Sequence, residues 1–340
     1  MASVKLDSVH KTYGSTPVVK GISLDIASGE LVSLLGPSGC GKTTTLRMIA
    51  GLEHLDAGTI SIGEQVVDGA RGRVPPEQRR LGMVFQSYAV WPHKSVAQNV
   101  AYPLQLQRVA GAEIARRVQE ALEWVRLGPF AERMPSQLSG GQLQRVAIAR
   151  ALVASPKVLL LDEPLSNLDA ALREELRGEI ASLRARLGTT MIFVTHDQHE
   201  ALALSDRVAV MNRGVIEQID APQRLYANPA TAFVAGFVGG ANRLEGRVER
   251  GAFVCQDVRF PLPPSLLSPA DRPATLAVRA ESIALGGDGP ALPLLAKLFL
   301  GHATEYRLKL GDGVLRAIGP DRAVKPGELL TVRFEAAHLF

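Results

Sequence analysis

The segment GPSGCGKT, residues 36–43, restricts the fold of this chain more than any other feature of its sequence. It fits the pattern G-x-x-x-x-G-K-[S/T], follows the apolar run LVSLLG and precedes the helix-like run KTTTLRMIAGL. A strand that ends in a glycine-rich loop and continues as a helix is one unit of an open α/β sheet. In such a loop Gly39 and Gly41 let backbone N–H groups surround a phosphate, Lys42 reaches the outer phosphates and Thr43 offers an oxygen to magnesium. The alternative is a turn that is merely rich in glycine, and the flanking strand and helix disfavour it.

Two later segments have the pattern of central strands of that sheet. KVLLLDEP and TMIFVTH are continuous apolar runs, as expected where both faces of a parallel strand are covered. Between them, an amphipathic helix carries apolar residues at helical spacing, namely Leu172, Leu176, Ile180, Leu183 and Leu187. Helical spacing also predicts a mostly helical subdomain at about 88–155.

The sequence changes character near residue 237. From there on, short strand-like runs such as RLEGRVERGAFVC and YRLKLGDGVLRAI are separated by Gly, Pro and Asp. We therefore expect an α/β domain over residues 1–236 and a separate, all-β domain over residues 237–340, built as a barrel or a sandwich.

Three polar side chains follow the predicted central strands. Asp162 ends the run VLLLD, so its carboxylate is expected beside the loop, where it can hold magnesium. The next residue, Glu163, suits a base that takes a proton from the attacking water or orients it. His196 closes MIFVTH, and parallel topology brings it to the same edge, near a γ-phosphate. Each of these groups alone could be a solvated charge at a strand end, but their convergence favours a nucleotide site. His199 could pair with His196 on a metal, yet no further ligands are visible.

Composition limits the remaining classes of function. The 340 residues include 38 basic and 34 acidic ones, interspersed along the chain, so a dedicated nucleic-acid surface is not expected despite a pI near 9.2. Cys40 and Cys255 cannot form a disulfide framework and indicate a reducing compartment. The beginning of the chain lacks an apolar signal core, and no apolar run is long enough to span a bilayer, so any membrane role is expected to come through a partner.

The segment QLSGGQ suggests a second phosphate-binding helix start. Ser139, Gly140 and Gly141 leave uncapped N–H groups at the positive end of a helix dipole, which favours an anion. Since residues 36–43 already supply one phosphate loop, this second element calls for a separate explanation.

Together these motifs resemble those of the ATP-binding cassette (ABC) ATPases, the motors of ABC transporters, over residues 1 to about 236. Besides the loop and the acidic strand, LSGGQ resembles the family signature, Gln86 in VFQS the Q-loop, SNLD the D-loop and His196 the switch histidine. The resemblance implies an α/β P-loop NTPase fold with ATP and Mg²⁺ as cofactors. It also implies that two chains meet head to tail, so that the signature of one chain closes over the ATP held by its partner's loop.

The resemblance assigns roles residue by residue. The residues expected to bind ATP are Tyr13, which would stack on adenine, Gly36, Pro37, Ser38, Gly39, Cys40, Gly41, Lys42, Thr43, Thr44, Gln86 and Asp162. Magnesium is expected on Thr43, Gln86 and Asp162, and catalysis on Glu163, His196 and Lys42. The signature acting on the partner's nucleotide comprises Leu138, Ser139, Gly140, Gly141 and Gln142, and Asp169 belongs to the D-loop.

Residues 237–340 resemble the OB-like regulatory domain of importer ATPases, although Ala280 replaces the expected proline and His199 stands where a Glu is common. The resemblance therefore implies the ATPase subunit of a bacterial importer. Such a subunit works as a homodimer at the cytoplasmic face of the inner membrane, with permease partners, an external solute-binding protein and no nucleic acid. The segment SYAVWPHKSVAQNV lies where members of the family contact the permease. Its sequence resembles ferric-iron and polyamine importers most, followed by sugar importers. A soluble ABC ATPase acting on nucleic acid or ribosomes and a mainly regulatory protein are the alternatives.

Overall fold

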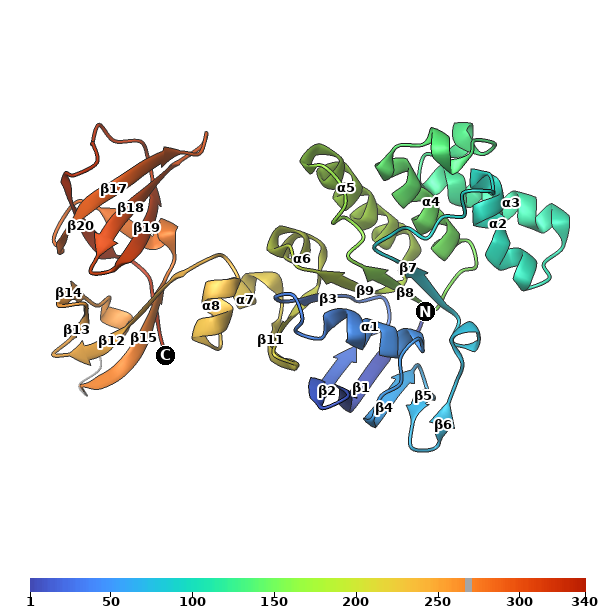
Figure 1. Cartoon of the computed structure of the whole chain (residues 1–340), viewed down its shortest axis with the longest axis horizontal. Coiled ribbons are helices and arrows are strands. Elements are labelled where there is room, and N and C mark those ends of the chain that lie inside the picture. The colour runs from blue at the N-terminus through green and yellow to red at the C-terminus, as the bar shows by residue number, and fades with distance from the viewer. Residues whose placement is uncertain (267–270) are drawn as a thin grey trace. The chain divides into compact units, whose positions relative to one another are not determined.

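The computed structural model describes residues 1–266 and 271–340, which form two compact units, Met1–Gln223 and Arg224–Phe340. Figure 1 labels the helices and strands of both units. The first unit is described without a gap and packs around two hydrophobic clusters, whereas the described part of the second packs around a cluster of its own. Each unit therefore has the core of an independent domain.

The first unit is built on two sheets. Its strands are β1 (Val4–Tyr13), β2 (Thr16–Ile26), β3 (Leu31–Leu35), β4 (Ala57–Ile62), β5 (Gln65–Gly69), β6 (Gly72–Arg73), β7 (Leu81–Val84), β8 (Val158–Asp162), β9 (Thr190–Thr195), β10 (Arg207–Asn212) and β11 (Val215–Asp220). The larger sheet has the order β11-β10-β3-β9-β8-β7, and β10, β3, β9, β8 and β7 run parallel. The smaller sheet, β2-β1-β4-β5-β6, is antiparallel.

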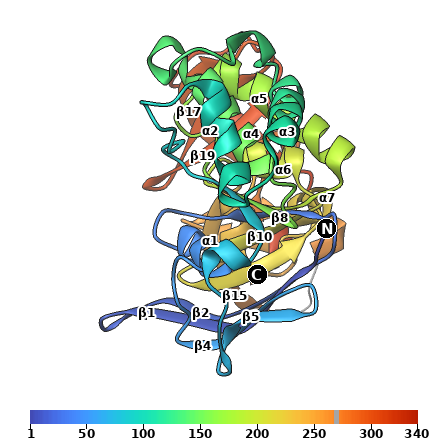
Figure 2. The same ribbon diagram turned by 90° about the vertical axis from the view of Figure 1, so that its right-hand side faces the viewer.

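Helices cover both faces of the larger sheet. They are α1 (Lys42–Ala50), α2 (Val96–Leu106), α3 (Gly111–Trp124), α4 (Gly140–Leu152), α5 (Ala170–Leu187) and α6 (Gln198–Leu204), with 3-10 turns at Pro76–Gln78, Gly128–Phe130 and Pro135–Gln137. Figures 1 and 2 show α1 between the two sheets, and its apolar residues belong to a cluster shared with both of them. Helices α2, α3, α4 and α5 contribute to the cluster on the opposite face.

The central strands are apolar throughout because each of their faces packs against a different cluster. In β8, Leu159 and Leu161 join the cluster of the helical side, while Val158 and Leu160 join the cluster around α1. This alternation is the period of two that a strand imposes on its side chains. The burial of both faces holds the strand ends in fixed positions, which the site requires.

Side-chain caps set where several helices of the first unit begin. Ser95 caps α2 and Ser139 caps α4, each in a capping box with the glutamine three residues later. Asp169 caps α5, because its Oδ1 accepts a hydrogen bond from Leu172 N at 2.9 Å. Helix α5 ends at Gly188, which adopts a left-handed φ of 59°.

The second unit is formed by two short helices followed by strands. Its elements are α7 (Pro222–Ala227), which crosses into it from the first unit, α8 (Ala232–Phe237), β12 (Asn242–Glu249), β13 (Ala252–Cys255), β14 (Val258–Pro261), β15 (Arg272–Val278), β16 (Ile283–Leu285), β17 (Ala291–Phe299), β18 (Thr304–Leu310), β19 (Gly313–Gly319), β20 (Leu329–Phe334) and β21 (His338–Leu339), with 3-10 turns at Pro264–Leu266 and Ala280–Ser282. The described residues form two five-stranded sheets, β14-β13-β12-β15-β21 and β16-β20-β17-β18-β19. Their inner faces share one core, in which Phe260 stacks on Phe334 with ring centroids 4.7 Å apart.

The fold class predicted from the sequence is confirmed, since a P-loop α/β core with a helical part is followed by a β-rich unit. The structure divides the chain at residues 223 and 224, so α7 and α8 are grouped with the β strands. The domain limits at 236 and 237 remain a prediction, and they fall between α8 and β12.

Candidate functional site

Four parallel strands end side by side at one edge of the larger sheet, in the order β3-β9-β8-β7. Residues 36–41 follow β3, His196 follows β9, Asp162 ends β8, and Gln86 comes two residues after β7. Since the carboxyl ends of parallel strands meet at one edge, residues that lie far apart in the sequence gather here.

The loop 36–41 has the conformation of a phosphate-binding loop. Gly39 and Gly41 adopt left-handed φ angles of 78° and 102°, which other residues rarely adopt. A Cβ atom on Gly41 would also stand only 2.9 Å from the carbonyl oxygen of Val18. Helix α1 begins at Lys42 without a side-chain cap, so N–H groups of its first turn are available to an anion.

Lys42 supplies the positive charge of the loop. Its side chain is buried, and Nζ donates hydrogen bonds to the carbonyl oxygens of Gly36 (2.8 Å) and Pro37 (3.0 Å). These acceptors are uncharged, so the ammonium keeps its net charge for a phosphate. Cys40 Sγ lies 3.9 Å from Nζ, and burial raises the pKa of this thiol, which keeps it protonated.

Three further residues predicted to bind ATP, Ser38, Thr43 and Thr44, are at least partly exposed. Ser38 is exposed at the tip of the loop, and Thr43 and Thr44 are half-buried in the first turn of α1. Thr43 Oγ1 donates to Asp162 Oδ1 at 3.0 Å, which joins the loop to the end of β8.

Thr43 and Asp162 fit a magnesium ion. Hydroxyl and carboxylate oxygens are the ligands that hard divalent cations prefer. Burial raises the pKa of Asp162, opposed by the hydrogen bond from Thr43. A cation would stabilise the ionised carboxylate, so the pair suits a metal that arrives with the nucleotide. No set of three or more His, Cys, Asp or Glu side chains is arranged for a metal in residues 1–266 and 271–340.

Glu163 is held in a strained position beside two other predicted site residues. Its φ is 45°, a left-handed value that is rare outside glycine, and its backbone N–H donates to Val194 O at 3.0 Å. Its Oε2 lies 3.2 Å from His196 Nδ1 and 3.4 Å from Gln86 Nε2. Strain of this kind persists where the surroundings fix the backbone, and it is common at active sites.

Two residues beside Glu163 were not assigned roles from the sequence. Ser166 Oγ donates to the carbonyl oxygen of Glu163 at 3.0 Å, and Asn167 Nδ2 donates to the carbonyl oxygen of Gln86 at 2.9 Å. Both belong to the SNLD segment, so that motif carried the signal, but their contacts depend on how β7 and β8 pair. They join the Q-loop glutamine to the D-loop.

A second acidic group supports the histidine turn. Glu200, which is almost fully buried, accepts a hydrogen bond from Thr195 Oγ1 at 2.6 Å, and burial raises the pKa of its carboxyl group. Arg173 of α5 lies 3.7 Å from Glu200 and 3.5 Å from Asp197. Because Asp169 of the D-loop caps α5, these ion pairs connect the D-loop helix to the turn that carries His196.

The signature residues lie at the beginning of α4, and the predicted uncapped start of this helix is wrong at Ser139, whose side chain caps it. Ser139 Oγ accepts from Gln142 N at 3.4 Å, and Gln142 Oε1 accepts from Ser139 N at 2.9 Å. A Cβ on Gly141 would stand 2.4 Å from Leu172, so this glycine permits close packing on α5. Gly140 is exposed, and Leu138 packs partly against the helical core.

Tyr13 ends β1 with 44% of its surface exposed, and Lys11 Nζ lies 5.3 Å from the centre of its ring. An exposed ring with a cation on one side can stack on a base through its other face. The adjoining strand β2 contacts the phosphate loop, because Val18 O and Val19 lie against Gly41.

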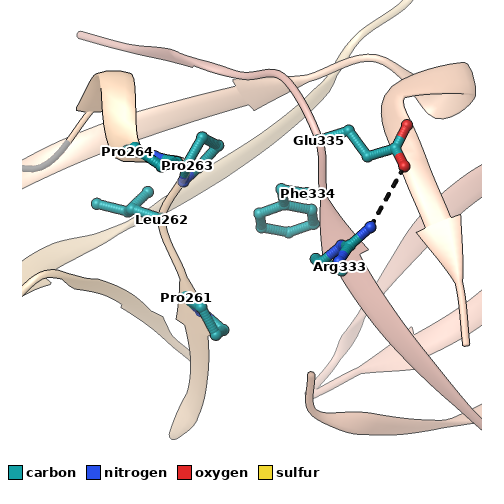
Figure 3. Close-up of a pocket in the computed structure, with 7 residues that line it drawn as sticks. All are labelled: Pro261, Leu262, Pro263, Pro264, Arg333, Phe334 and Glu335. Atoms are coloured by element: carbon teal, nitrogen blue, oxygen red, sulfur yellow. Dashed lines mark ion pairs between the residues drawn. The ribbon is translucent and has the colours of Figure 1, made fainter. Parts of the chain in front are cut away.

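The second unit contains a cavity of about 400 Å³, shown in Figure 3. Its lining residues are Pro261, Leu262, Pro263, Pro264, Arg333, Phe334 and Glu335. The ion pair between Arg333 and Glu335, at 3.6 Å, is more than half exposed and therefore contributes little energy. This cavity offers an apolar wall but shows no convergence of groups that would support a reaction.

The fold and the strand-end residues define a P-loop nucleotide hydrolase. Comparison with known proteins agrees, since the family described as ABC transporter matches residues 19–166. The ATP-binding cassette MJ0796, solved as a dimer in a post-hydrolysis state bound to ADP and Pi, is 35% identical with a TM-score of 0.58. That similarity covers 64% of this chain and 98% of MJ0796.

Two curated relatives match over nearly the whole chain. The sn-glycerol-3-phosphate import ATP-binding protein UgpC 2 of Agrobacterium fabrum is 44% identical, covering 100% of this chain and 92% of that protein. The spermidine/putrescine import ATP-binding protein PotA of Rubrobacter xylanophilus is 46% identical, covering 99% and 92%. The chain belongs to the family of ABC transporter ATP-binding proteins, and it is an ATPase of the ABC type.

Proposed function

We propose that this chain is the ATP-hydrolysing subunit of an ABC importer and that it works as a homodimer. The observation that carries the proposal is the meeting of Lys42, the Thr43–Asp162 pair and the Glu163–His196 pair at one edge of the sheet. The names of the curated relatives, which are import ATP-binding proteins, support the direction of transport.

Each of these residues has a defined part in hydrolysis. Lys42 and the N–H groups of the loop hold the phosphates, and Glu163 accepts a proton from the attacking water. His196 Nδ1 donates to the Glu163 carboxylate and orients it, and in the protonated form of the ring the second nitrogen also donates to a γ-phosphate oxygen. Thr43 and Asp162, with the Gln86 amide oxygen, would hold Mg²⁺, which supplies charge neutralisation at the phosphate oxygens when it is bound.

The signature residues Ser139 and Gly140 act on the nucleotide of the second chain in this proposal. The dimeric state of MJ0796 supports such an arrangement. A two-fold dimer then contains two shared sites, and nucleotide at the interface favours the closed dimer.

Mixed dimers test the sharing of sites. Lys42→Ala damages the loop of its own chain, and Ser139→Arg damages the signature that serves the other chain. A heterodimer of the two variants has one intact site and one that is damaged twice. We expect the mixture to recover ATPase activity above either variant alone; no recovery would refute sites shared between chains.

We propose that a permease subunit docks in a groove beside the residues that follow Gln86. Two adjoining hollows, of about 260 and 920 Å³, share residues Leu81, Pro103 and Ala154 between β7, α2 and α4. Phe85, Ala89 and Trp91 line the smaller hollow, so it adjoins the segment that follows Gln86. A helix from a membrane subunit that docks here would sense the position of Gln86.

Among the described residues there is no helix that is both long and apolar enough to span a membrane. We propose that the protein lies at the cytoplasmic face of the cell membrane through its permease, and that an external solute-binding protein delivers the solute. Copurification of integral-membrane subunits tests this placement; copurified RNA or DNA in their place would favour the alternative of an ATPase that acts on nucleic acid.

In this proposal the permease and the binding protein recognise the solute, so its chemical class is inferred from the relatives. The relatives support a phosphorylated polyol or a polyamine, whereas ferric iron receives no support from them. The test is the ATPase rate of the permease complex with its binding protein, on addition of sn-glycerol 3-phosphate, spermidine or ferric iron. Stimulation by ferric iron alone would contradict the assignment.

A further inference from the structure

Residues 86–91, here called the linking segment, join the catalytic edge to the outer groove. At its start, Asn167 Nδ2 donates to the carbonyl oxygen of Gln86 at 2.9 Å. At its end, Trp91 N donates to Asn99 Oδ1 at 2.9 Å, and Asn99 Nδ2 donates to Trp91 O at 3.1 Å. Asn99 is fully buried in α2, so both ends of the segment are fixed.

The middle of the linking segment is held by the signature helix α4. Tyr88 and Ala89 adopt left-handed φ angles of 63° and 50°, which are unfavourable for residues with side chains. Arg150 of α4 donates to Tyr88 O at 2.8 Å and to Ala89 O at 2.6 Å, and its guanidinium lies 4.8 Å from the centre of the Trp91 ring. Because Arg150 is only 8% exposed, these bonds are shielded from water.

Two polar groups at this contact are buried and unpaired. Neither Tyr88 Oη nor the two amide atoms of Gln144 have a hydrogen-bond partner in the described part of the chain. Gln144 is 0% exposed, and burial raises the pKa of Tyr88, so its hydroxyl remains a donor at neutral pH. Unpaired buried polar groups cost free energy and are rare, so they require an explanation.

The two groups lie at the same turn of α4. Tyr88 Oη is 3.9 Å from the position that a Cβ on Gly140 would occupy. Gln144 follows Gly140 by four residues, and side chains of a helix tilt toward its N-terminus, so the Gln144 side chain extends toward the Gly140 turn. The Tyr88 hydroxyl and the Gln144 amide are therefore both directed to the first turn of α4, and no hydrogen bond joins them.

We propose that Tyr88 Oη donates a hydrogen bond to the Gln144 amide oxygen when the signature engages nucleotide, and that this bond positions Gln86 against Glu163. The proposal rests on the function proposed above and describes how the signature communicates with Gln86 at the catalytic edge. Pairing two groups that are otherwise unpaired gives the two states a difference in free energy, which a conformational switch requires. Tyr88 and Gln144 are positioning residues, since they act through Gln86.

The test is a double-mutant cycle on the ATPase turnover of the full-length protein. We expect Tyr88→Phe and Gln144→Leu each to lower kcat by about 2- to 10-fold, the usual worth of one hydrogen bond, with KM for ATP unchanged. The double variant should be no slower than the slower single variant, because both changes remove the same bond. The Tm without nucleotide should stay equal or rise in each, since each change removes an unpaired buried group.

Several results would overturn the pairing. One is wild-type turnover in both single variants, and another is a double variant in which the two losses multiply. Gln144→Met serves as a second variant if the leucine protein does not fold, and Tyr306→Phe, a tyrosine in the second unit, is the matched control with unchanged turnover. If the wild-type protein does not hydrolyse ATP, or if Glu163→Gln leaves hydrolysis intact, the proposed function fails and the pairing fails with it. If only the pairing fails, the wild-type protein still hydrolyses ATP and Glu163→Gln still slows hydrolysis.

Discussion

The two units differ in how their buried polar side chains are partnered. In the described part of the chain, the buried side-chain atoms without a hydrogen-bond partner belong to the first unit, in Arg73, Tyr88, Gln144, Arg145, Arg173 and Glu179. In the second unit, Tyr306 Oη donates to Pro320 O at 2.7 Å, and Thr304 Oγ1 donates to Asp321 Oδ1 at 3.0 Å. Polar groups in the second unit therefore fasten its strands together.

Backbone strain occurs in both units. In the first unit nine residues with side chains adopt left-handed φ angles, and three of them, Tyr88, Ala89 and Glu163, lie near the nucleotide edge. In the described part of the second unit, such angles occur in hairpin turns, at Arg250 between β12 and β13 and at Gln256 and Asp257 between β13 and β14. The contrast in buried polar groups indicates that the first unit, with Glu163 strained at its nucleotide edge, gives up some stability that the second unit keeps.

The largest effect is expected at Glu163, where function and stability should separate. Glu163→Gln keeps the hydrogen-bonding shape but removes the base, so ATP hydrolysis should slow by about 10²- to 10⁴-fold while ATP binding persists. Turnover and nucleotide binding measured on the same preparation check this. Near-normal turnover would remove Glu163 from the role of base.

Arg279 in the second unit is expected to affect stability and not ATP hydrolysis. It is 8% exposed, donates to Val238 O at 2.8 Å, and lies 3.5 Å from the centre of the Tyr226 ring. Arg279→Met should cost about 2–4 kcal/mol of stability, because it leaves buried carbonyl groups unpaired. Denaturant unfolding, followed by hydrogen exchange over β12 to β20, measures the loss.

The matched control for Arg279 is Arg272→Met, an exposed arginine at the start of β15, which should change stability by less than about 0.5 kcal/mol. The ATPase rate of the protein without permease should be unchanged in both variants. Equal losses of stability at the two positions would contradict a structural role specific to Arg279.

Tyr306→Phe should have a smaller effect on the second unit. The side chain is fully buried, and the change removes only the hydrogen bond to Pro320 O. We expect a loss of about 1 kcal/mol, with the packing of the ring retained. An unchanged or higher Tm would show that this bond does not stabilise the unit, which would weaken the contrast between the units.

The smallest effect is a pH dependence at Glu305. Burial alone raises the pKa of this carboxyl group, but hydrogen bonds from Arg307 and Arg316 outweigh burial and hold the pKa below its usual range. A carboxyl pKa that is lower in the folded state adds stability above the unfolded pKa of about 4.3, and this stability is lost as the pH falls through the folded value.

Glu305→Gln should therefore flatten the decline in stability below pH about 4.3, measured by denaturant unfolding between pH 3 and 6. Parallel pH profiles of the wild-type protein and the variant would show that Glu305 does not contribute to acid sensitivity.

The strand-end residues of the site could be predicted because they follow simple patterns. Asp162 and His196 each close a continuous apolar run, and such runs become buried parallel strands whose ends share an edge. The phosphate loop was equally accessible, since its glycines and lysine occur at fixed spacing between a strand and a helix.

The supporting contacts could not be predicted, because they depend on tertiary pairing. Asn167 meets Gln86 across 81 residues, and Arg150 holds Tyr88 across 62 residues. No local pattern encodes the order β3-β9-β8-β7 or the pairing of β21 with β15. Side chains such as Gln144 appear in the sequence as ordinary helix residues, and only burial shows that they are unpaired.

A nucleotide site completed by a second chain is tested most directly by the mass in solution of the Glu163→Gln protein, with and without Mg²⁺ and ATP. Binding without hydrolysis should trap the closed state, so we expect a monomer mass of 36.4 kDa without ATP and twice that mass with it. A mass that does not change, in a protein that demonstrably binds ATP, would contradict a signature that acts across the dimer.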